Sequence, residues 1–405
     1  MSDAYIARQP IFDHRMRIFG YEILYREGPR PVPHYNLDGD QATSNVLIDM
    51  FTYHDLDRLI GGYRAFINLT PTFLYDPSIL PLSRDRLVLE VLEDIAVNSE
   101  LLEALNKLTH QGYTLALDDF ILNDQTRPLL PLADIIKVDI QQVSAEELRS
   151  YVAEFRPFGA KLLAEKVETH EELDFCRSLG FHYFQGFFLS RPRVLKARRL
   201  PADRIRVLNL LRRLQDPDLN FDELAELVAE DVYLSYRLLR LINSAYFPIR
   251  RKVESIQRAV VYLGLNGVRT WATWIALAGI HDKPSELKVV ALARARMCAL
   301  LCDALGGSHR DRYFTVGLFS AVDALLDLPM AKALEPLPLA EDVRDAILDH
   351  RGHLGRALEA TLGYEQGDWE KADQLALPAA RVKEIYLDSL EWARDIDDTL
   401  HAETQ

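Results

Sequence analysis

Seven short runs rich in β-branched and aromatic residues recur through the first half of the chain, and each carries polar residues at or near its end. The runs are RIFGYEIL with Glu22, RAFINL with Asn68, RLVLEV with Glu90, YTLALDD with Asp118 and Asp119, DIIKVD with Lys137 and Asp139, KLLAEKVE with Glu165 and Glu168, and HYFQGF with Gln185. Such runs are typical of buried strands, and helical stretches separate several of them. The pattern therefore predicts βα units and a parallel sheet.

In a closed β/α barrel the carboxyl ends of the strands meet at one rim, where active sites are built. Several carboxylates gathered at one rim repel each other and lose hydration, unless cations lie among them. We therefore expect a site for hard divalent cations, Mg²⁺ or Mn²⁺, with two ions in an active enzyme. Either of the adjacent Asp118 and Asp119 can bridge two ions. Glu22, Asn68 and Glu90 are the expected ligands of one ion, with Asp139 and Glu165 near the other. Lys137 is expected to offset the charge or to hold the attacking water and the phosphate.

Composition limits the remaining possibilities. The chain has 405 residues, enough for two domains, and a formal net charge of −14, which disfavours binding to DNA or RNA. Its three cysteines form no disulfide framework. No stretch approaches the ~20 apolar residues of a membrane span, and the N-terminus does not resemble a secretory signal. These observations predict a cytoplasmic protein.

The strand-rich half ends in FFLSRPRVLKARRLPADR, after which almost every segment has helical periodicity. We place a barrel-like domain at 1–195, a linker at 196–203 and an all-helical domain at 204–405. Three prolines between Asn68 and Glu90 argue against a full crossover helix there. The barrel is therefore expected to be trimmed or irregular at that connection.

The order YEILYR, FINLT, LEVLED, LALDDF, IKVD, AEKVET, YFQGFFLSRP resembles that of EAL domains, which are phosphodiesterases of the bacterial messenger cyclic di-GMP. The resemblance covers about 1–195 and implies a modified β/α barrel of the TIM type. It also implies the following roles: metal ligands at Glu22, Asn68, Glu90, Asp118 and Asp119, a catalytic Lys137, a general base at Glu165, and cyclic di-GMP contacts from Arg26 and Gln185.

The chain departs from the EAL pattern at the supporting residues. Glu-Ala-Leu reads Glu22-Ile23-Leu24, and the Gly-Thr-Gly loop after the paired aspartates is replaced by Phe120-Ile121-Leu122-Asn123-Asp124. In active relatives that loop, with a glutamate matching Glu93, links dimerisation to metal binding, so a homodimer is one expected assembly. Lys166 replaces the glycine that follows the general base, which adds a cation at the edge of the site.

The second half, through LRLINSAYFPIRRKVESIQRAVVYLGLNGVRTW, resembles HDOD domains, helical modules related to HD-type metal phosphohydrolases. In the helix predicted over YFTVGLFSAVDALL, Ser320 and Ala321 stand where the metal-binding His and Asp would stand. This implies a catalytically inactive domain that contacts a protein partner. We expect His281-Asp282 and Asp349-His350 to be polar helix ends instead of metal sites, and Trp271 and Trp274 to be core residues.

Three functions are compatible with the sequence. The first is a metal-dependent phosphodiesterase that opens cyclic di-GMP to linear pGpG, with an activity that can be weak or conditional. The second is a catalytically impaired EAL domain that senses cyclic di-GMP. The third is a scaffold that makes only protein contacts. The retained site residues favour the first two, and the altered loop with Lys166 weighs against turnover.

Overall fold

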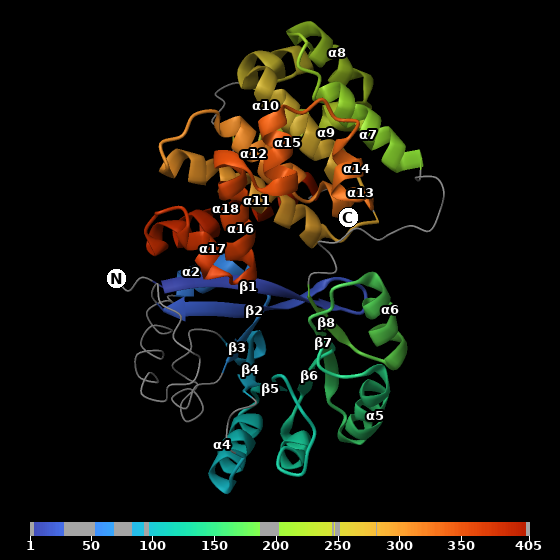
Figure 1. Cartoon of the computed structure of the whole chain (residues 1–405), viewed down its shortest axis with the longest axis vertical. Helices are drawn as coiled ribbons and strands as arrows, with labels where there is room; N and C mark the ends of the chain where they lie inside the picture. The colour runs from blue at the N-terminus through green and yellow to red at the C-terminus, as the bar shows by residue number, and fades with distance from the viewer. Residues whose placement is uncertain are drawn as a thin grey trace. The chain divides into compact units, whose positions relative to one another are not determined.

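The computed structural model describes residues 4–27, 53–68, 83–92, 97–186, 202–244, 247, 252–280 and 282–401; the side chains of residues 4, 25–27, 53–55, 202, 400 and 401 are not described. The chain forms two compact units (Figure 1). The barrel unit comprises Met1–Leu189 with the segments Glu365–Trp369 and Pro378–Lys383, and the helical unit comprises Ser190–Tyr364, Glu370–Leu377 and Glu384–Gln405.

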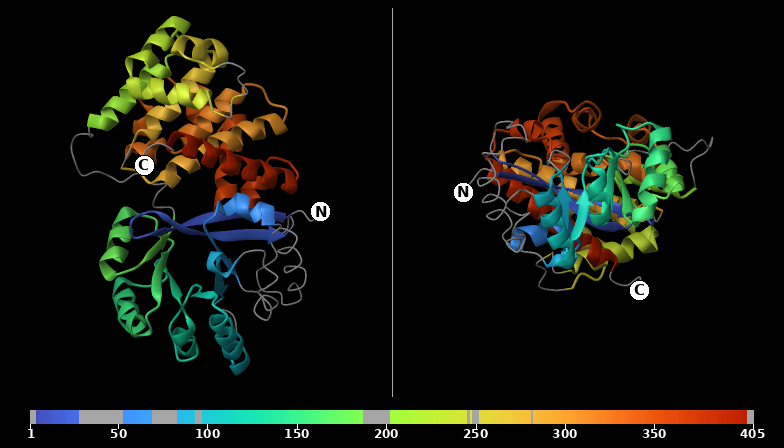
Figure 2. Two further views of the ribbon diagram at one scale, coloured as in Figure 1. Left: turned by 180° about the vertical axis from the view of Figure 1, so that it is seen from behind. Right: turned by 90° about the horizontal axis from the view of Figure 1, so that it is seen from below.

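Eight strands close into a barrel in chain order, with the last strand beside the first (Figures 1 and 2). They are β1 (Ala4–Asp13), β2 (Ile18–Glu27), β3 (Arg64–Asn68), β4 (Leu87–Val91), β5 (Thr114–Leu117), β6 (Ile135–Asp139), β7 (Lys161–Glu165) and β8 (Tyr183–Gln185). Strands β2 to β8 pair in parallel, whereas β1 runs antiparallel to both of its neighbours. The predicted fold class, a modified TIM-type barrel followed by helices, is confirmed.

Strand β1 is the part of the barrel that the sequence patterns did not reveal. Its run AYIARQPIFD mixes apolar and polar residues and contains Pro10, which cannot donate a backbone hydrogen bond. Only residues 14–17 connect β1 to β2. This link is too short for a parallel crossover, so the strand must run antiparallel. The predicted parallel sheet therefore holds for β2 to β8, and β1 departs from it.

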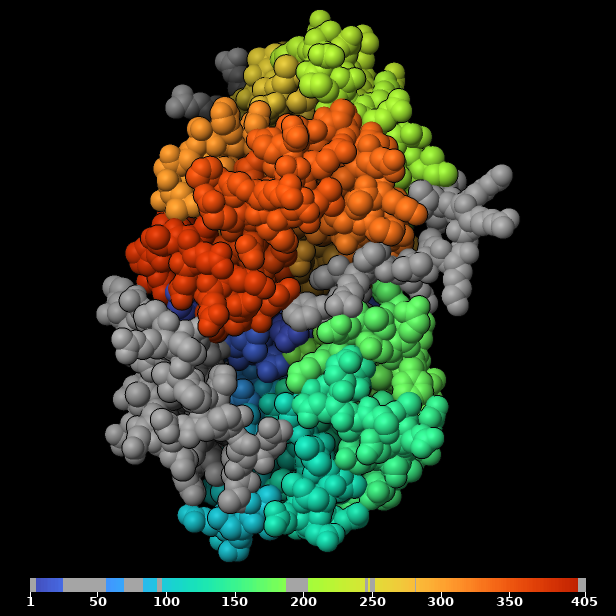
Figure 3. All heavy atoms as spheres, in the orientation of Figure 1, coloured from blue at the N-terminus to red at the C-terminus, as the bar shows by residue number. Residues whose placement is uncertain are grey.

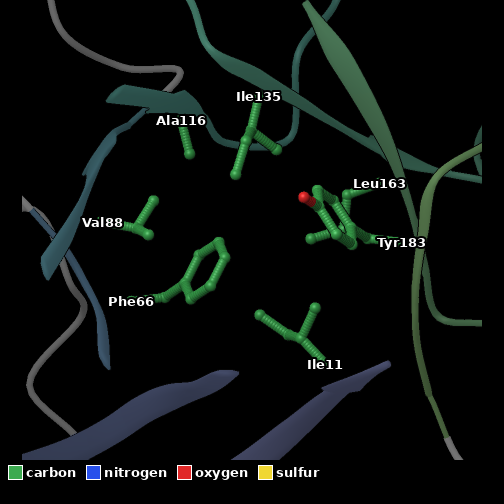
Figure 4. Packing of buried hydrophobic residues seen from close by; sticks show 7 residues of the cluster. All are labelled: Ile11, Phe66, Val88, Ala116, Ile135, Leu163 and Tyr183. Carbon is green, nitrogen blue, oxygen red and sulfur yellow. The ribbon is translucent and has the colours of Figure 1, made fainter. Parts of the chain in front are cut away.

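Seven buried side chains fill the interior of the barrel and point toward one another (Figure 4): Ile11, Phe66, Val88, Ala116, Ile135, Leu163 and Tyr183. Side chains alternate between the two faces of a strand, so the residue two positions further along also faces inward. In the six parallel strands β3 to β8, these next residues are Asn68, Glu90, Asp118, Lys137, Glu165 and Gln185. The apolar layer is therefore the floor beneath the polar residues.

The helices of the barrel unit are α2 (Tyr53–Ile60), α4 (Ser99–His110), α5 (Ala145–Phe155) and α6 (His170–Leu179), with 3₁₀ helices η3 (Arg84–Arg86), η4 (Arg127–Leu132) and η5 (Arg156–Phe158). Atoms of α4 to α6 lie at the surface of the unit (Figure 3). Ser144 and Thr169 begin α5 and α6 with complete capping boxes. The connection from β5 to β6 carries η4 and no α-helix. Residues 69–82 lie outside the described residues, so the predicted irregularity there remains a prediction.

The described residues after 201 form only α-helices as regular elements. These are α7 (Ala202–Leu214), α8 (Phe221–Glu230), α9 (Val232–Ile242), α10 (Ile256–Ala278), α11 (Ser285–Ala304), α12 (Arg310–Phe319), α13 (Val322–Leu326), α14 (Met330–Leu334), α15 (Glu341–Asp349), α16 (Gly352–Gln366), α17 (Trp369–Asp373) and α18 (Ala379–His401). Trp271 and Trp274 are buried, as predicted. The linker predicted at 196–203 falls largely on residues 187–201, which are not described. Of the described helices, none combines the length and the apolar character needed to cross a membrane.

Candidate active site at the carboxyl ends of the strands

The side chain of Lys137 lies at the centre of the inward-facing polar residues and is fully buried. Its Nζ atom pairs with carboxylates from four different strands: Glu90 Oε1 at 2.6 Å, Asp118 Oδ1 at 2.6 Å, Glu165 Oε1 at 3.1 Å and Glu22 Oε2 at 3.6 Å. The four carboxylates come from the middle of β2, from the carboxyl ends of β4 and β7, and from the residue directly after β5. Side chains that lie up to 143 positions apart in the chain thus converge on one ammonium group.

Burial and charge shift the pKa values of this cluster in opposite ways. Burial alone would lower the pKa of Lys137, but the charges of Glu165, Glu22, Glu90 and Asp118 raise it well above its usual range. Burial raises the pKa of Glu165 to about 8, although Lys137 partly offsets this effect. Burial likewise raises the pKa of Glu90. The raised pKa values of Glu90 and Glu165 indicate that one ammonium does not fully offset four carboxylates, so a further cation would favour their ionised forms.

Gln185 connects this cluster to the first strand. Its Nε2 atom donates hydrogen bonds to Glu22 Oε2 and to Gln9 Oε1, the latter at 3.0 Å. Gln9 lies opposite Glu22 in the register of β1 and β2. The sequence patterns missed Gln9 because they missed β1. The short link between the two strands was the signal that could have placed it at the rim.

The other predicted residues lie next to members of this cluster in the strand register or in the chain. Asn68 is opposite Glu90 in the register of β3 and β4. Asp119 directly follows Asp118 and adopts a positive φ of 41°. Burial and the neighbouring Asp118 raise the pKa of Asp119. Asp139, opposite Glu165 in the register of β6 and β7, pairs with Lys166 at 2.5 Å.

Two residues of the predicted set cannot be placed. Arg26 belongs to β2, but its side chain lies outside the described residues. Glu93 also falls on a stretch that the structure does not describe. Their roles therefore remain predictions from the resemblance.

The donor atoms at the rim suit a hard divalent cation. Asn68 Oδ1, Glu90 Oε2, Asp119 Oδ1 and Glu165 Oε2 are buried oxygens that accept no hydrogen bond. A buried oxygen without a partner is costly, and a cation would satisfy it. In the described part of the chain, however, no three His, Cys, Asp or Glu side chains are arranged as a ready ligand set. We attribute the absence of such a set to the Lys137 ammonium, which lies among the carboxylates. This ammonium would have to move partly aside for an ion to bind.

Of the His281-Asp282 and Asp349-His350 pairs in the helical half, His281 lies outside the described residues. Arg204 Nη2 donates hydrogen bonds to both carboxylate oxygens of Asp282, each at 2.9 Å. His350 ends α15 in a left-handed conformation. Ser320 and Ala321 lie between α12 and α13, which corrects the prediction of one continuous helix there. Ser320 Oγ donates to the carbonyl of Gly317 at 2.7 Å.

Two family models match the chain in succession. The EAL domain model matches residues 37–192, and the HDOD domain model matches residues 200–345. The EAL match begins after Glu22, so the altered Glu-Ile-Leu triplet lies ahead of it.

Two relatives match this chain over nearly its whole length. The cyclic di-GMP phosphodiesterase CdgJ of Vibrio cholerae is 33% identical over 98% of this chain and 94% of its own length. The protein YuxH of Bacillus subtilis is 32% identical over 97% of this chain and 99% of its own length. The solved structure of Bacillus subtilis YkuI, an EAL-domain protein in complex with cyclic di-GMP and calcium, is 20% identical and covers 56% of this chain and 72% of that one. Its TM-score of 0.40 is too low to support an inference about this chain. From the two domain matches and the full-length relatives, we conclude that the chain belongs to the family of proteins in which an EAL domain is followed by an HDOD domain.

Proposed function

We propose that the barrel unit is a metal-dependent phosphodiesterase that hydrolyses cyclic di-GMP to linear pGpG. The observation that carries this proposal is the convergence of Glu22, Glu90, Asp118 and Glu165 on the buried Lys137. Such a cluster of buried charge contributes little to stability compared with an apolar barrel interior. The full-length similarity to a relative named as a cyclic di-GMP phosphodiesterase supports the same substrate.

The cation would be Mg²⁺ or Mn²⁺, held by oxygens of Glu22, Asn68, Glu90, Asp118 and Asp119. When bound, it would polarise the phosphodiester and lower the pKa of a coordinated water. All other chemistry in the proposal belongs to side chains of this protein. Gln185 and Arg26 are proposed to contact the nucleotide.

Glu165 is suited to act as the general base. Its Oε1 atom pairs with Lys137, whereas its buried Oε2 atom accepts no hydrogen bond and is available to take a proton from water. Its pKa of about 8 lies close to neutral pH, where a base combines proton affinity with partial ionisation. Lys137 positions this carboxylate and stabilises its charged form.

We further propose that the helical unit is a non-catalytic HDOD domain that binds a protein partner. Neither Ser320 nor Ala321 can replace a metal-binding His-Asp pair, because serine is a poor ligand for a divalent cation and alanine has no ligand atom. Homodimerisation of the chain and a cytoplasmic location remain proposals. Binding of DNA or RNA is not expected at a net charge of −14.

A cyclic di-GMP sensor or protein-interaction scaffold without turnover is the second candidate, and the loop after the paired aspartates favours it. The side chain of Asn123 accepts hydrogen bonds from the backbone of Gln125 and Thr126, and Thr126 Oγ1 donates to the carbonyl of Ile121 at 2.7 Å. These bonds hold the loop in one conformation without glycines. A fixed loop can leave ligands about 1 Å from the productive position, which can reduce turnover ~10²-fold.

One experiment separates these functions. The purified full-length chain is incubated with cyclic di-GMP and Mn²⁺ or Mg²⁺, product is followed by chromatography, and binding is measured by calorimetry. We expect pGpG to form and Glu165→Gln to lower the rate at least ~100-fold, with the exposed Glu154→Gln as a control that retains it. Binding without turnover would favour the sensor. No binding and no turnover would favour the protein-interaction scaffold.

A further inference from the structure

Lys166 occupies a backbone position that ordinarily favours glycine. It directly follows β7 and adopts φ 54°, in the left-handed region that is unfavourable for a non-glycine residue. Two hydrogen bonds hold this conformation. Gln141 Nε2 donates to the Lys166 carbonyl at 3.2 Å, and the next residue, Val167, donates its N–H to the Gln185 carbonyl at 3.0 Å. The strained lysine is therefore supported by its surroundings and points to a role for its side chain.

The ammonium of Lys166 is bound to Asp139. Its Nζ atom lies 2.5 Å from Asp139 Oδ2, which also accepts a hydrogen bond from Gln142 Nε2 at 2.8 Å. The other oxygen, Oδ1, accepts the N–H of Gln141 at 2.9 Å. Both oxygens of this buried carboxylate are therefore engaged by the protein. A metal ion that bound Asp139 would compete with these hydrogen bonds and would be repelled by the nearby Lys166 ammonium.

Lys166 also influences the neighbouring carboxylates. Burial tends to lower the pKa of Lys166, but its hydrogen bond to Asp139 and the charges of Asp119, Asp139 and Glu165 raise it. The ammonium is thus a permanent positive charge near the three carboxylates expected around the second ion. Buried oxygens without hydrogen bonds occur in both groups: Asn68 Oδ1 and Glu90 Oε2 around the first ion, and Asp119 Oδ1 and Glu165 Oε2 around the second. Within the second group, Asp139 is the carboxylate that pairs directly with Lys166.

We propose that Lys166 takes the place of a second divalent cation, so that the rim of this barrel binds one divalent ion instead of two. This inference rests on the proposed function, because it concerns the metal content of the same site. Asp139 is then a residue that positions Lys166 and not a metal ligand. The ammonium supplies one positive charge and three hydrogen-bond donors for a phosphate, in place of a coordination shell.

The number of bound ions tests this inference directly. The full-length chain is titrated with Mn²⁺ by calorimetry, and the electron paramagnetic resonance spectrum of the saturated protein is recorded. Two ions ~3.5–4 Å apart, as in two-metal sites, would be magnetically coupled. We expect one uncoupled Mn²⁺ per chain in the parent protein and two coupled ions in Lys166→Gly, which removes the ammonium and relieves the positive φ.

Three further variants control the interpretation. Lys166→Asn removes the charge but tolerates the left-handed conformation, so it should also bind two ions even if the glycine variant folds poorly. Lys166→Arg keeps a cation and should bind one. Met16→Gly relieves a similar φ of 61° in the turn between β1 and β2, at the opposite end of the barrel, and should bind one ion.

The inference is overturned if the parent protein binds two coupled ions, if it binds none, or if the glycine and asparagine variants both still bind one. The proposed function is judged separately by turnover of cyclic di-GMP. A parent protein that hydrolyses the nucleotide with two bound ions would refute the role of Lys166 only. One bound ion without turnover, with a second ion appearing in the variants, would refute the phosphodiesterase only.

Discussion

The Nζ atom of Lys137 lies 2.6 Å from Oε1 of Glu90, and neither side chain is exposed to solvent. A buried ion pair of this kind contributes modestly to stability compared with apolar packing, but losing one partner leaves the other charge stranded. The same ammonium also pairs with three further carboxylates. The barrel rim is therefore more sensitive to the loss of this lysine than to the loss of any single carboxylate.

Lys137→Met should destabilise the metal-free protein by about 3–5 kcal/mol, because the buried carboxylates would lose the ammonium with which all four of them pair. This loss of stability should become smaller as pH falls, because protonation removes the carboxylate charges that Lys137 neutralised. Urea unfolding at several pH values measures both effects. Lys107→Met, on the exposed face of α4, is the control and should change stability by less than about 0.5 kcal/mol. Equal effects of the two substitutions would contradict the role of Lys137.

Binding of a divalent cation should release protons at neutral pH. The pKa of Glu165 is about 8 in the metal-free protein, so at pH 7 its carboxyl is mostly protonated. A dication beside it favours the ionised form, so the proton leaves on binding. Apparent metal affinity should therefore rise with pH until about 8, and proton release should decline above that value.

Calorimetry of Mn²⁺ binding in buffers of different ionisation enthalpy measures the released protons. Glu165→Gln should release up to one proton fewer per chain than the parent at pH 7. Glu154→Gln, an exposed residue paired with Arg127, should match the parent. Identical proton release by the parent and Glu165→Gln would show that this carboxyl is not linked to metal binding.

Gly186→Ala should destabilise the barrel by more than about 2 kcal/mol. Gly186 has φ 146°, and an added Cβ would lie 2.1 Å from the carbonyl oxygen of Val167, a backbone atom that cannot move aside freely. The shift would also displace Gln185 from Glu22. Gly159→Ala is a matched control, since its φ is 76° but no atom lies within 4 Å of an added Cβ. Its cost should stay near 1–2 kcal/mol. Similar unfolding midpoints for the two variants would argue against the close contact.

The helical unit should lose stability as pH rises through the range of about 4 to 6. Burial raises the pKa of Asp323 from its usual 3.8 to about 6, although its hydrogen bond from Ala324 and the charge of Arg294 partly offset this. Below pH 3.8 the carboxyl is protonated in both states. As pH rises, the unfolded chain ionises first, so the folded state bears a penalty that is complete above about pH 6. A shift of about two units corresponds to at most ~3 kcal/mol.

Asp323→Asn should remove this penalty, stabilise the chain by about 1–3 kcal/mol at pH 7 and flatten the curve. Thermal unfolding between pH 4 and 7.5 provides the measurement. Asp342→Asn is the control, because the exposed Asp342 accepts the N–H of the next residue in the same way. If Asp323→Asn were no more stable than the parent at pH 7, the carboxyl would not carry a penalty in the folded state.

Much of the barrel could be predicted because each strand carries its information locally. In β4, β6 and β7 an apolar residue is followed two positions later by Glu90, Lys137 or Glu165, and strand alternation alone places both on the same face. The antiparallel β1 was missed, since its apolar pattern is interrupted by Arg8, Gln9 and Pro10. Gln9, whose side chain accepts a hydrogen bond from Gln185, was missed for the same reason.

The contacts of Asp139 show what the strand pattern does not contain. Because Asp139 ends β6 and lies opposite Glu165, the strand pattern alone predicts that it is a metal ligand. In the folded protein its oxygens accept hydrogen bonds from Gln141, Gln142 and Lys166. Whether a carboxylate at the rim faces its neighbours or a lysine depends on side-chain directions that the strand pattern does not contain.

By itself the sequence determined that polar groups end successive strands and that a helical module follows, and its resemblance to HDOD domains predicted that the metal-binding pair of that module is missing. Only the tertiary structure decided that four of those groups meet on Lys137, that β1 closes the barrel in reverse, and that Lys166 engages Asp139. The reason is physical: alternation and periodicity act over a few residues, whereas the distances between side chains at the rim are set by closure of all eight strands.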